Sequence, residues 1–161
     1  MRKVVLTSLA VCAAVLFGAP ARAQQAPLVY GPGLNLEIAT KAVNAAVAEA
    51  KKNGWFMAIA VTTNGGYLVH FSRMDGTQFA SIKIAQHKAR TAATYRRPTK
   101  ALADALAAGN SFILTLDDVI AVDGGLPLIG ADGKMIGAIG CSGATGAQDA
   151  QACMAGVNAI K

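Results

Sequence analysis

The sequence predicts an α+β fold, a single domain in which helices flank an antiparallel sheet. Two pairs of short apolar segments are joined by turn sequences, Asn64-Gly65-Gly66 and Ala131-Asp132-Gly133. Asn-Gly and Asp-Gly pairs between such segments are strong signals for β-hairpins. Segments with helical spacing separate the two hairpins and lie at both ends of the domain, so we expect the helices to pack on the sheet.

The first half of the domain contains two expected helices and the first hairpin. A helix is expected over Leu34–Asn53, where apolar residues recur every three or four positions, and Gly54 supplies a stop at its C-terminal end. The strands Phe56–Thr63 and Tyr67–Arg73 should then pair in an antiparallel manner. A second long helix is expected over Gly76–Tyr95.

The second half begins with a helix that Pro98 can open and that continues over Ala101–Ala108. The segment Ser111–Leu116 fits either a strand or a helix. The remaining expected elements are short strands at Val119–Val122 and Leu128–Ile129, a last strand over Lys134–Cys141, a glycine-rich loop over Ser142–Gly146 and a closing helix over Ala147–Ile160.

The N-terminus has the layout of a secretory signal peptide. Met1-Arg2-Lys3 is basic, Val4–Phe17 is almost entirely apolar, and Ala21-Arg22-Ala23 offers small residues at both positions that a signal peptidase recognises. The apolar run is shorter than the roughly 20 residues that cross a bilayer, which argues against a membrane anchor. We therefore predict that residues 1–23 are removed and that residues 24–161 form a periplasmic or secreted domain without a membrane span.

Half of the net charge belongs to this predicted signal. The chain carries 15 Lys and Arg against 9 Asp and Glu, a net charge of +6, and loss of Arg2, Lys3 and Arg22 leaves +3. Nucleic-acid binding would require basic residues clustered on one face. The one local cluster, Arg96-Arg97 with Lys100, is small, so no nucleic-acid partner is expected.

Two cysteines remain after the predicted signal, Cys141 near the end of a strand and Cys153 in the helix that follows. In an oxidising compartment they could form a disulfide. The alternative is two separate buried thiols that behave as small apolar residues, since neither cysteine lies in a recognisable disulfide framework. Their spacing matches no zinc motif.

Two groups of residues could meet a small-molecule ligand. Arg73 and Asp75 lie between a strand and the second long helix, where Asp75 could cap the helix. Alternatively, this helix N-terminus could bind a ligand carboxylate with Arg73 beside it. Glycines around Gly125 and in Ser142-Gly143 could bring backbone N–H groups to the same ligand, or could serve turns and close packing alone. This hypothesis describes a binder of small organic acids or a cofactor-free enzyme.

His70 and His87 are the only histidines in the chain. They form no closely spaced set of metal ligands, and each fits a surface histidine or one satisfied by its neighbours. Two histidines also support no ordered Ser–His–Asp or Cys–His–Asn arrangement, and Cys141 has no identifiable base beside it as a nucleophile. A single axial histidine is nevertheless enough to hold haem, given apolar walls and basic groups at the propionates.

Several motifs in fixed order resemble the GlcG/HbpS-like haem-binding family, which also includes the C-terminal domain of PduO-type cobalamin adenosyltransferases. They are Ile59-Ala60-Val61 with Asn64-Gly65-Gly66, Arg73-Met74-Asp75-Gly76, the segment Ile84–Ala92, Pro98-Thr99, Gly124-Gly125-Leu126-Pro127, Ile136–Gly143 and Asp149. The resemblance implies a profilin-like domain, usually assembled into dimers or larger rings. It also implies haem binding for some members, with haem degradation or redox sensing proposed for a few.

Haem is the cofactor that this resemblance leads us to expect. His87 is the first choice of iron ligand because it has cationic neighbours, His70 is the second, and no other metal site is expected. The chain departs from the family pattern at Thr62-Thr63, where Asp is frequent, and at Cys141, where Val is frequent. The residues expected to contact haem or a ligand are His87, His70, Arg73, Lys88, Arg90, Asp75, Gly125, Ser142 and Gly143.

Overall fold

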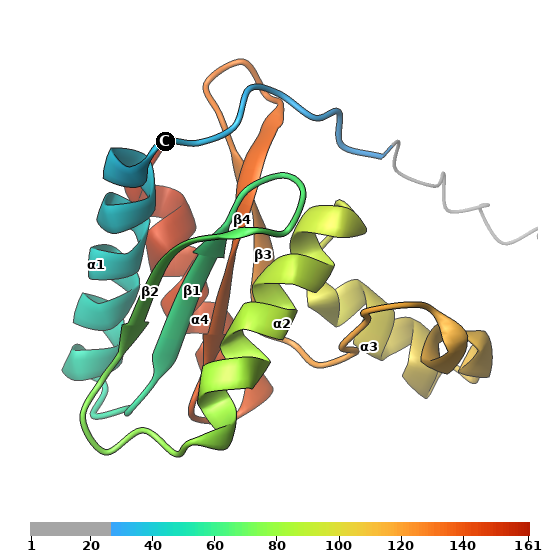
Figure 1. The fold of residues 1–161 in the computed structure, drawn as a ribbon. Coiled ribbons are helices and arrows are strands. Elements are labelled where there is room, and N and C mark those ends of the chain that lie inside the picture. The colour runs from blue at the N-terminus through green and yellow to red at the C-terminus, as the bar shows by residue number, and fades with distance from the viewer. Residues whose placement is uncertain (1–26) are drawn as a thin grey trace, which may run out of the picture.

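The computed structural model describes residues 27–161, and the signal peptide predicted over residues 1–23 lies outside them. The fold of the described residues has four α-helices and four strands. The strands form one sheet, and helices lie on both of its faces (Figure 1). The α+β class predicted from the sequence is confirmed. In chain order the elements are α1 (Leu36–Lys52), β1 (Ala58–Thr62), β2 (Leu68–Arg73), α2 (Ala80–Thr94), α3 (Thr99–Ala107), the short 3-10 helix η1 (Ser111–Thr115), β3 (Gly125–Ile129), β4 (Met135–Ser142) and α4 (Gly146–Ala159).

The sheet is antiparallel throughout, with strand order β2-β1-β4-β3. Both expected hairpins are present. The Thr63 N–H donates to the Tyr67 carbonyl across the first turn, and the Gly130 N–H donates to the Lys134 carbonyl across the second. The two hairpins meet in the middle of the sheet, where β1 pairs with β4. Residues of β1 and β4 are therefore covered on both faces, and all of them are buried.

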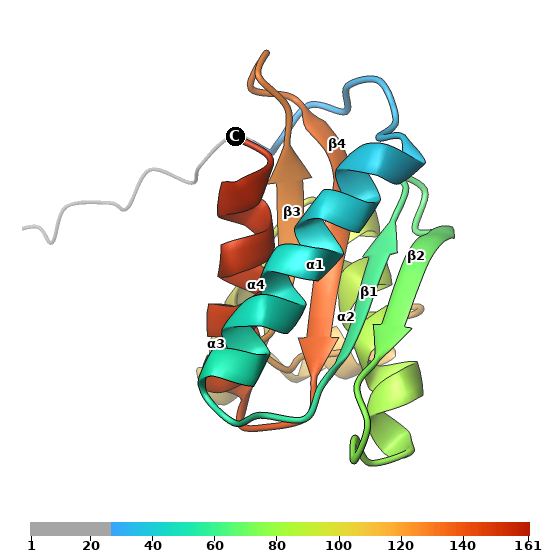
Figure 2. The ribbon, with the colours of Figure 1, turned by 90° about the vertical axis from the view of Figure 1, so that its left-hand side faces the viewer.

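One face of the sheet carries the larger apolar side chains and is covered by α1 and α4 (Figure 2). The helices contribute mainly small residues to this layer, which lets them approach the branched side chains of the strands closely. The buried cluster includes Ile59, Val61, Leu128 and Ile139 from the sheet, Ala39, Ala42, Val43 and Ala46 from α1, and Ala152, Cys153 and Val157 from α4.

The other face carries mainly alanine and glycine, with Met135 as a larger exception, and is covered by α2 (Figure 1). A Cβ on Gly140 would meet the Ala85 carbonyl and would lie 2.5 Å from the Ala89 nitrogen. A Cβ on Gly125 would lie 2.5 Å from the Lys88 carbonyl. The backbone of α2 therefore rests directly on the strands, because glycine leaves the space that it occupies.

The structure corrects the expected start of this helix. α2 begins at Ala80, four residues later than predicted, and Phe79 at its N-cap makes no side-chain capping bond. Asp75 and Gly76 instead form a tight turn closed by the Thr77 N–H and the Met74 carbonyl, with Gly76 at φ +80°. The prediction that Asp75 caps α2 is wrong, because this turn separates its carboxylate from the first helical N–H groups.

The structure resolves one ambiguous segment and corrects one predicted strand. Ser111–Thr115 is the 3-10 helix η1, which follows α3 at the side of the molecule. The strand expected at Val119–Val122 is absent, and these residues are irregular. The backbone at Asp118 and Ile120 instead bonds to α2, since the Thr91 hydroxyl accepts from the Ile120 N–H and donates to the Asp118 carbonyl.

Within residues 27–161, no helix combines the length and the apolar character needed to cross a membrane.

The close contact between α2 and the sheet predicts that a methyl group added at Gly140 destabilises the protein, whereas one added at Gly33 does not. Gly140→Ala should lower the free energy of unfolding by about 1–3 kcal/mol, because backbone atoms of α2 cannot yield as a flexible side chain would. Gly33→Ala is the matched control, since a Cβ there would meet nothing within 4 Å. Urea denaturation compares the two variants. Equal stabilities would show that α2 does not lie so close to the strands.

Candidate functional site

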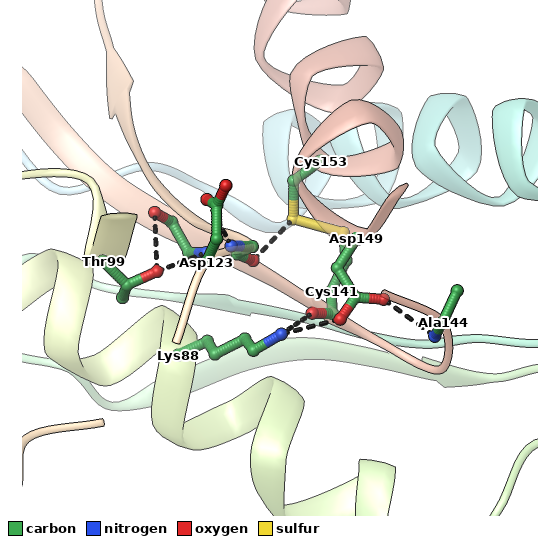
Figure 3. Close-up of a disulfide and its surroundings, with 9 residues drawn as sticks. Lys88, Thr99, Asp123, Cys141, Ala144, Asp149 and Cys153 are labelled. Carbon is green, nitrogen blue, oxygen red and sulfur yellow. Dashed lines mark hydrogen bonds and ion pairs between the residues drawn. A yellow bond between two sulfur atoms is a disulfide. The ribbon is translucent and has the colours of Figure 1, made fainter. Parts of the chain in front are cut away.

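Lys88 and Asp149 form a buried ion pair that connects α2 with α4 (Figure 3). Lys88 Nζ lies 2.7 Å from Asp149 Oδ2, and the two side chains are only 1% and 3% exposed. Nζ also donates to the Cys141 carbonyl at 3.1 Å. The other carboxylate oxygen of Asp149 accepts from the Ala144 N–H at 3.0 Å. The pair thus fixes α2, the end of β4 and the loop before α4 relative to one another.

The electrostatics of this pair are dominated by loss of solvent. Burial raises the pKa of the Asp149 carboxyl above its ordinary value, and the Lys88 ammonium partly offsets that rise. Such a pair stabilises a fold only while both charges and their hydrogen bonds are in place. Lys88, which was expected beside a ligand, is therefore occupied inside the protein, with no surface for a propionate to reach.

A disulfide between Cys141 and Cys153 lies next to the ion pair (Figure 3). It joins the end of β4 to the second turn of α4, with the two Cα atoms 5.7 Å apart. Of the two alternatives that the sequence left open, the structure has the bridge. The disulfide and the Lys88–Asp149 pair both hold α4 against β4, so the position of α4 is fixed covalently as well as by charge.

Lys88 occupies the space beside the glycines that were considered for ligand binding. A Cβ on Gly124 would lie 2.9 Å from Lys88 Nζ and 2.7 Å from the Asp149 Cβ, and Gly124 has φ +110°. The Gly125 N–H donates to the Thr99 hydroxyl at 2.9 Å. Gly124 and Gly125 therefore serve the close packing of α2, α3 and α4 against the start of β3, and their backbone is not open to a ligand.

His87 lies on the outer side of α2 with a second charged cluster. Its Nε2 is 3.2 Å from Asp118 Oδ1, and Arg90 Nη1 is 3.0 Å from Asp118 Oδ2. Asp118 holds a left-handed backbone conformation, with φ +55°. A cavity of about 240 Å³, lined by these three residues with Lys83 and Gln86, opens here. We call it the His87 pocket. The structure thus unites His87 with Arg90, both predicted as site residues.

The other predicted site residues lie apart from this pocket. His70 faces α1, with Nδ1 3.4 Å from the Thr40 hydroxyl. Arg73 donates to the Thr77 carbonyl and its guanidinium lies 4.9 Å from the centre of the Phe79 ring. Ser142 is buried and bonds to the Ser81 hydroxyl at 3.1 Å. Asp75 is exposed in its turn. Gly143 packs closely against the chain before β1, where an added Cβ would meet the Phe56 carbonyl.

A larger cavity of about 810 Å³ lies beside the edge strand β3. We call it the β3 cavity. Its walls come from the residues before α1, the start of α3, β3 and α4. They are mostly apolar, with two arginines at the end of α2. The lining residues are Pro27, Leu28, Arg96, Arg97, Pro98, Ala101, Leu126, Pro127, Ile129, Met154 and Val157.

Three residues of these sites were missed or left without a role by sequence reasoning. Asp149 appeared only within a family motif, Asp118 lies in an irregular segment, and Met154 is one apolar residue of a helix. No periodicity distinguishes any of them, because each acquires its role from residues distant in the sequence. Groups of three or more His, Cys, Asp or Glu side chains placed to hold a metal ion are absent from residues 27–161.

The chain matches known proteins over most of its length. A family model described as haem degrading protein, HbpS-like, matches residues 34–158. Protein GlcG of Escherichia coli K12 is 42% identical over 109 residues, which are 68% of this chain and 81% of GlcG. The crystal structure of a Streptomyces reticuli HbpS double mutant superimposes with a TM-score of 0.75 at 34% identity, covering 89% of this chain and 98% of that one.

A fourth similarity concerns the fold alone. A crystal structure described as a PduOC–haem complex superimposes with a TM-score of 0.72 at 24% identity, covering 80% of this chain and 96% of that chain. At this identity, the agreement concerns the arrangement of helices and strands and does not transfer individual ligands.

The buried pair predicts a large difference between two lysine substitutions. Lys88→Met should lower the free energy of unfolding by about 3–5 kcal/mol, because Asp149 is left buried and unpaired. Lys100→Met is the control, since its pair with Asp104 is exposed and should be worth about 1 kcal/mol or less.

The double variant Lys88→Met with Asp149→Leu should recover much of this loss, because it removes both buried charges together. Urea denaturation measures all three proteins. A Lys88→Met protein as stable as Lys100→Met would contradict the assigned pairing.

Proposed function

This chain belongs to the HbpS-like family, and we propose that it is an exported haem-binding protein whose haem site is the β3 cavity. The description of the family names haem degradation, and one structural relative is described as a haem complex. The observation that carries the proposal for this chain is the combination of cavity size, apolar walls and two arginines at one site.

The residues of the β3 cavity fit the chemistry of haem. Its volume of about 810 Å³ lies within the range of roughly 300–1,000 Å³ that is usual for ligand pockets. Leu126, Pro127 and Val157 are buried and supply an apolar wall for a flat macrocycle. Because haem also carries two carboxylates, a suitable site needs cationic groups beside the apolar wall.

Arg97 is the side chain best placed to meet a propionate. It is exposed, and its Nε donates only to the nearby Tyr95 carbonyl, which leaves its terminal N–H groups for a carboxylate. Arg96 is more strongly held. Its guanidinium donates to the Leu28 carbonyl and lies 5.3 Å from the centre of the Tyr30 ring. Arg96 therefore shapes the wall of the cavity, and Arg97 is the residue free to bind the ligand.

Export is the second part of the proposal. The N-terminal basic, apolar and small-residue regions match the order of a secretory signal. The Cys141–Cys153 disulfide supports this compartment, because disulfides persist in oxidising environments and are rare in the cytosol. The proposal therefore places haem binding in the periplasm or outside the cell.

Substitution of Arg97 tests the position of the haem site. We expect the protein to bind hemin, with a shifted Soret band, and Arg97→Gln to weaken binding roughly tenfold through loss of a charge-assisted hydrogen bond. Lys100→Gln is the matched control, since it removes an equal charge three residues further along the chain, at a side chain that does not line the cavity. His87→Ala serves as a second comparison. Weakening in His87→Ala but not in Arg97→Gln would place haem at the His87 pocket.

Export predicts a defined N-terminus. After expression of the full chain in a Gram-negative host, the periplasmic fraction should contain a protein that begins at Gln24. Intact-mass measurement identifies that species, and Ala23→Arg should block its formation by removing the small residue at the cleavage position. Recovery of the uncleaved chain from the cytosol alone would overturn the proposal of export.

A further inference from the structure

Met154 holds an unusual position for a methionine in this protein. It lies on α4, is 44% exposed, and lines the β3 cavity. Met57 and Met135, in contrast, are fully buried in the core. Val157, one turn further along α4, lines the same cavity, so Met154 and Val157 present one face of the helix to it. The thioether of Met154 is thus available to a molecule in the cavity.

The lining of the cavity contains few atoms that could bind iron. Its other members are aliphatic residues, prolines and two arginines, and an arginine carries no free lone pair for a metal. Among the lining residues, Met154 alone carries a side-chain atom of the kind that ligates haem iron. Both histidines line other surfaces: His87 contacts Asp118, and His70 contacts Thr40.

The backbone at Met154 is held in place by its neighbour. Cys153 is fully buried and is bonded to Cys141 of β4, so the turn of α4 that carries Met154 is tied to the sheet. The Lys88–Asp149 pair holds the preceding turn of the same helix. A flexible side chain on a fixed backbone suits a ligand site, because the thioether sulfur can adjust its position while the backbone of Met154 stays in place.

We propose that Met154 Sγ is an axial ligand of haem iron in the β3 cavity. This inference rests on the proposed haem binding and adds the identity of the ligand. The ligand comes from α4, and Arg97, which follows α2 and lines the same cavity, would bind a propionate. Thioether ligation favours the ferrous state and raises the reduction potential of haem. It therefore distinguishes this site from one built on a histidine.

The test compares absorption spectra of hemin-loaded variants in the ferric and ferrous states. Met154→Leu should bind hemin more weakly, shift the Soret band and lose the thioether-to-iron charge-transfer absorption of the ferric protein. Leucine nearly conserves the volume of methionine, so the cavity wall should stay intact. Met74→Leu is the matched control, since Met74 packs against the core and does not line the cavity. Its spectra should equal those of the unsubstituted protein.

Met154→His gives a second, independent readout. It should replace the thioether signature with that of histidine ligation and lower the reduction potential. Unchanged spectra in Met154→Leu, with hemin still bound, would overturn the ligand assignment and leave haem binding intact. If His87→Ala or His70→Ala, and not Met154→Leu, abolishes the spectral signature of the bound hemin, the iron ligand is that histidine and the assignment of Met154 is overturned. An unsubstituted protein that binds no hemin would overturn both the ligand assignment and the proposed function.

Discussion

The close approach of α2 to the sheet is the contact on which the rest of this structure depends. It requires glycine at positions 125 and 140, where a single added methyl group would meet the helix backbone. That approach brings Lys88 within 2.7 Å of Asp149, although the two residues come from helices on different sides of the sheet. A buried charge is costly unless its partner is positioned this closely, so packing and electrostatics here depend on each other.

The same packing determines where a ligand can bind. The centre of the molecule is filled on both faces of the sheet, and Gly124 and Gly125 accommodate Lys88 and the backbone of α2. The larger cavity opens at the edge strand β3, where the lead-in to α1, the start of α3 and α4 meet. Pro127 suits this position, because an edge strand tolerates a residue without a backbone donor. The disulfide then holds α4 as one wall of the cavity.

Local patterns predicted the elements more accurately than their ends. The turn at Asn64-Gly65-Gly66 and the helical spacing of α1 were sufficient to place both elements, since each depends on neighbouring residues. The start of α2 was misjudged because Asp75-Gly76 is favourable both for a turn and near a helix start, and the turn prevailed. The Val119–Val122 strand failed because Thr91 of α2 engages that backbone instead.

The sequence by itself determined the α+β class, the two hairpins, the family and the expectation of export, because these follow from short-range periodicity, turn residues and motif order. Only the tertiary structure decided that Cys141 and Cys153 are bonded, that Lys88 pairs with Asp149, and that Met154 faces the same cavity as Arg97. Each of these results joins residues from different elements. Their proximity depends on how α2, α3 and α4 pack on the strands, and no local pattern encodes that arrangement.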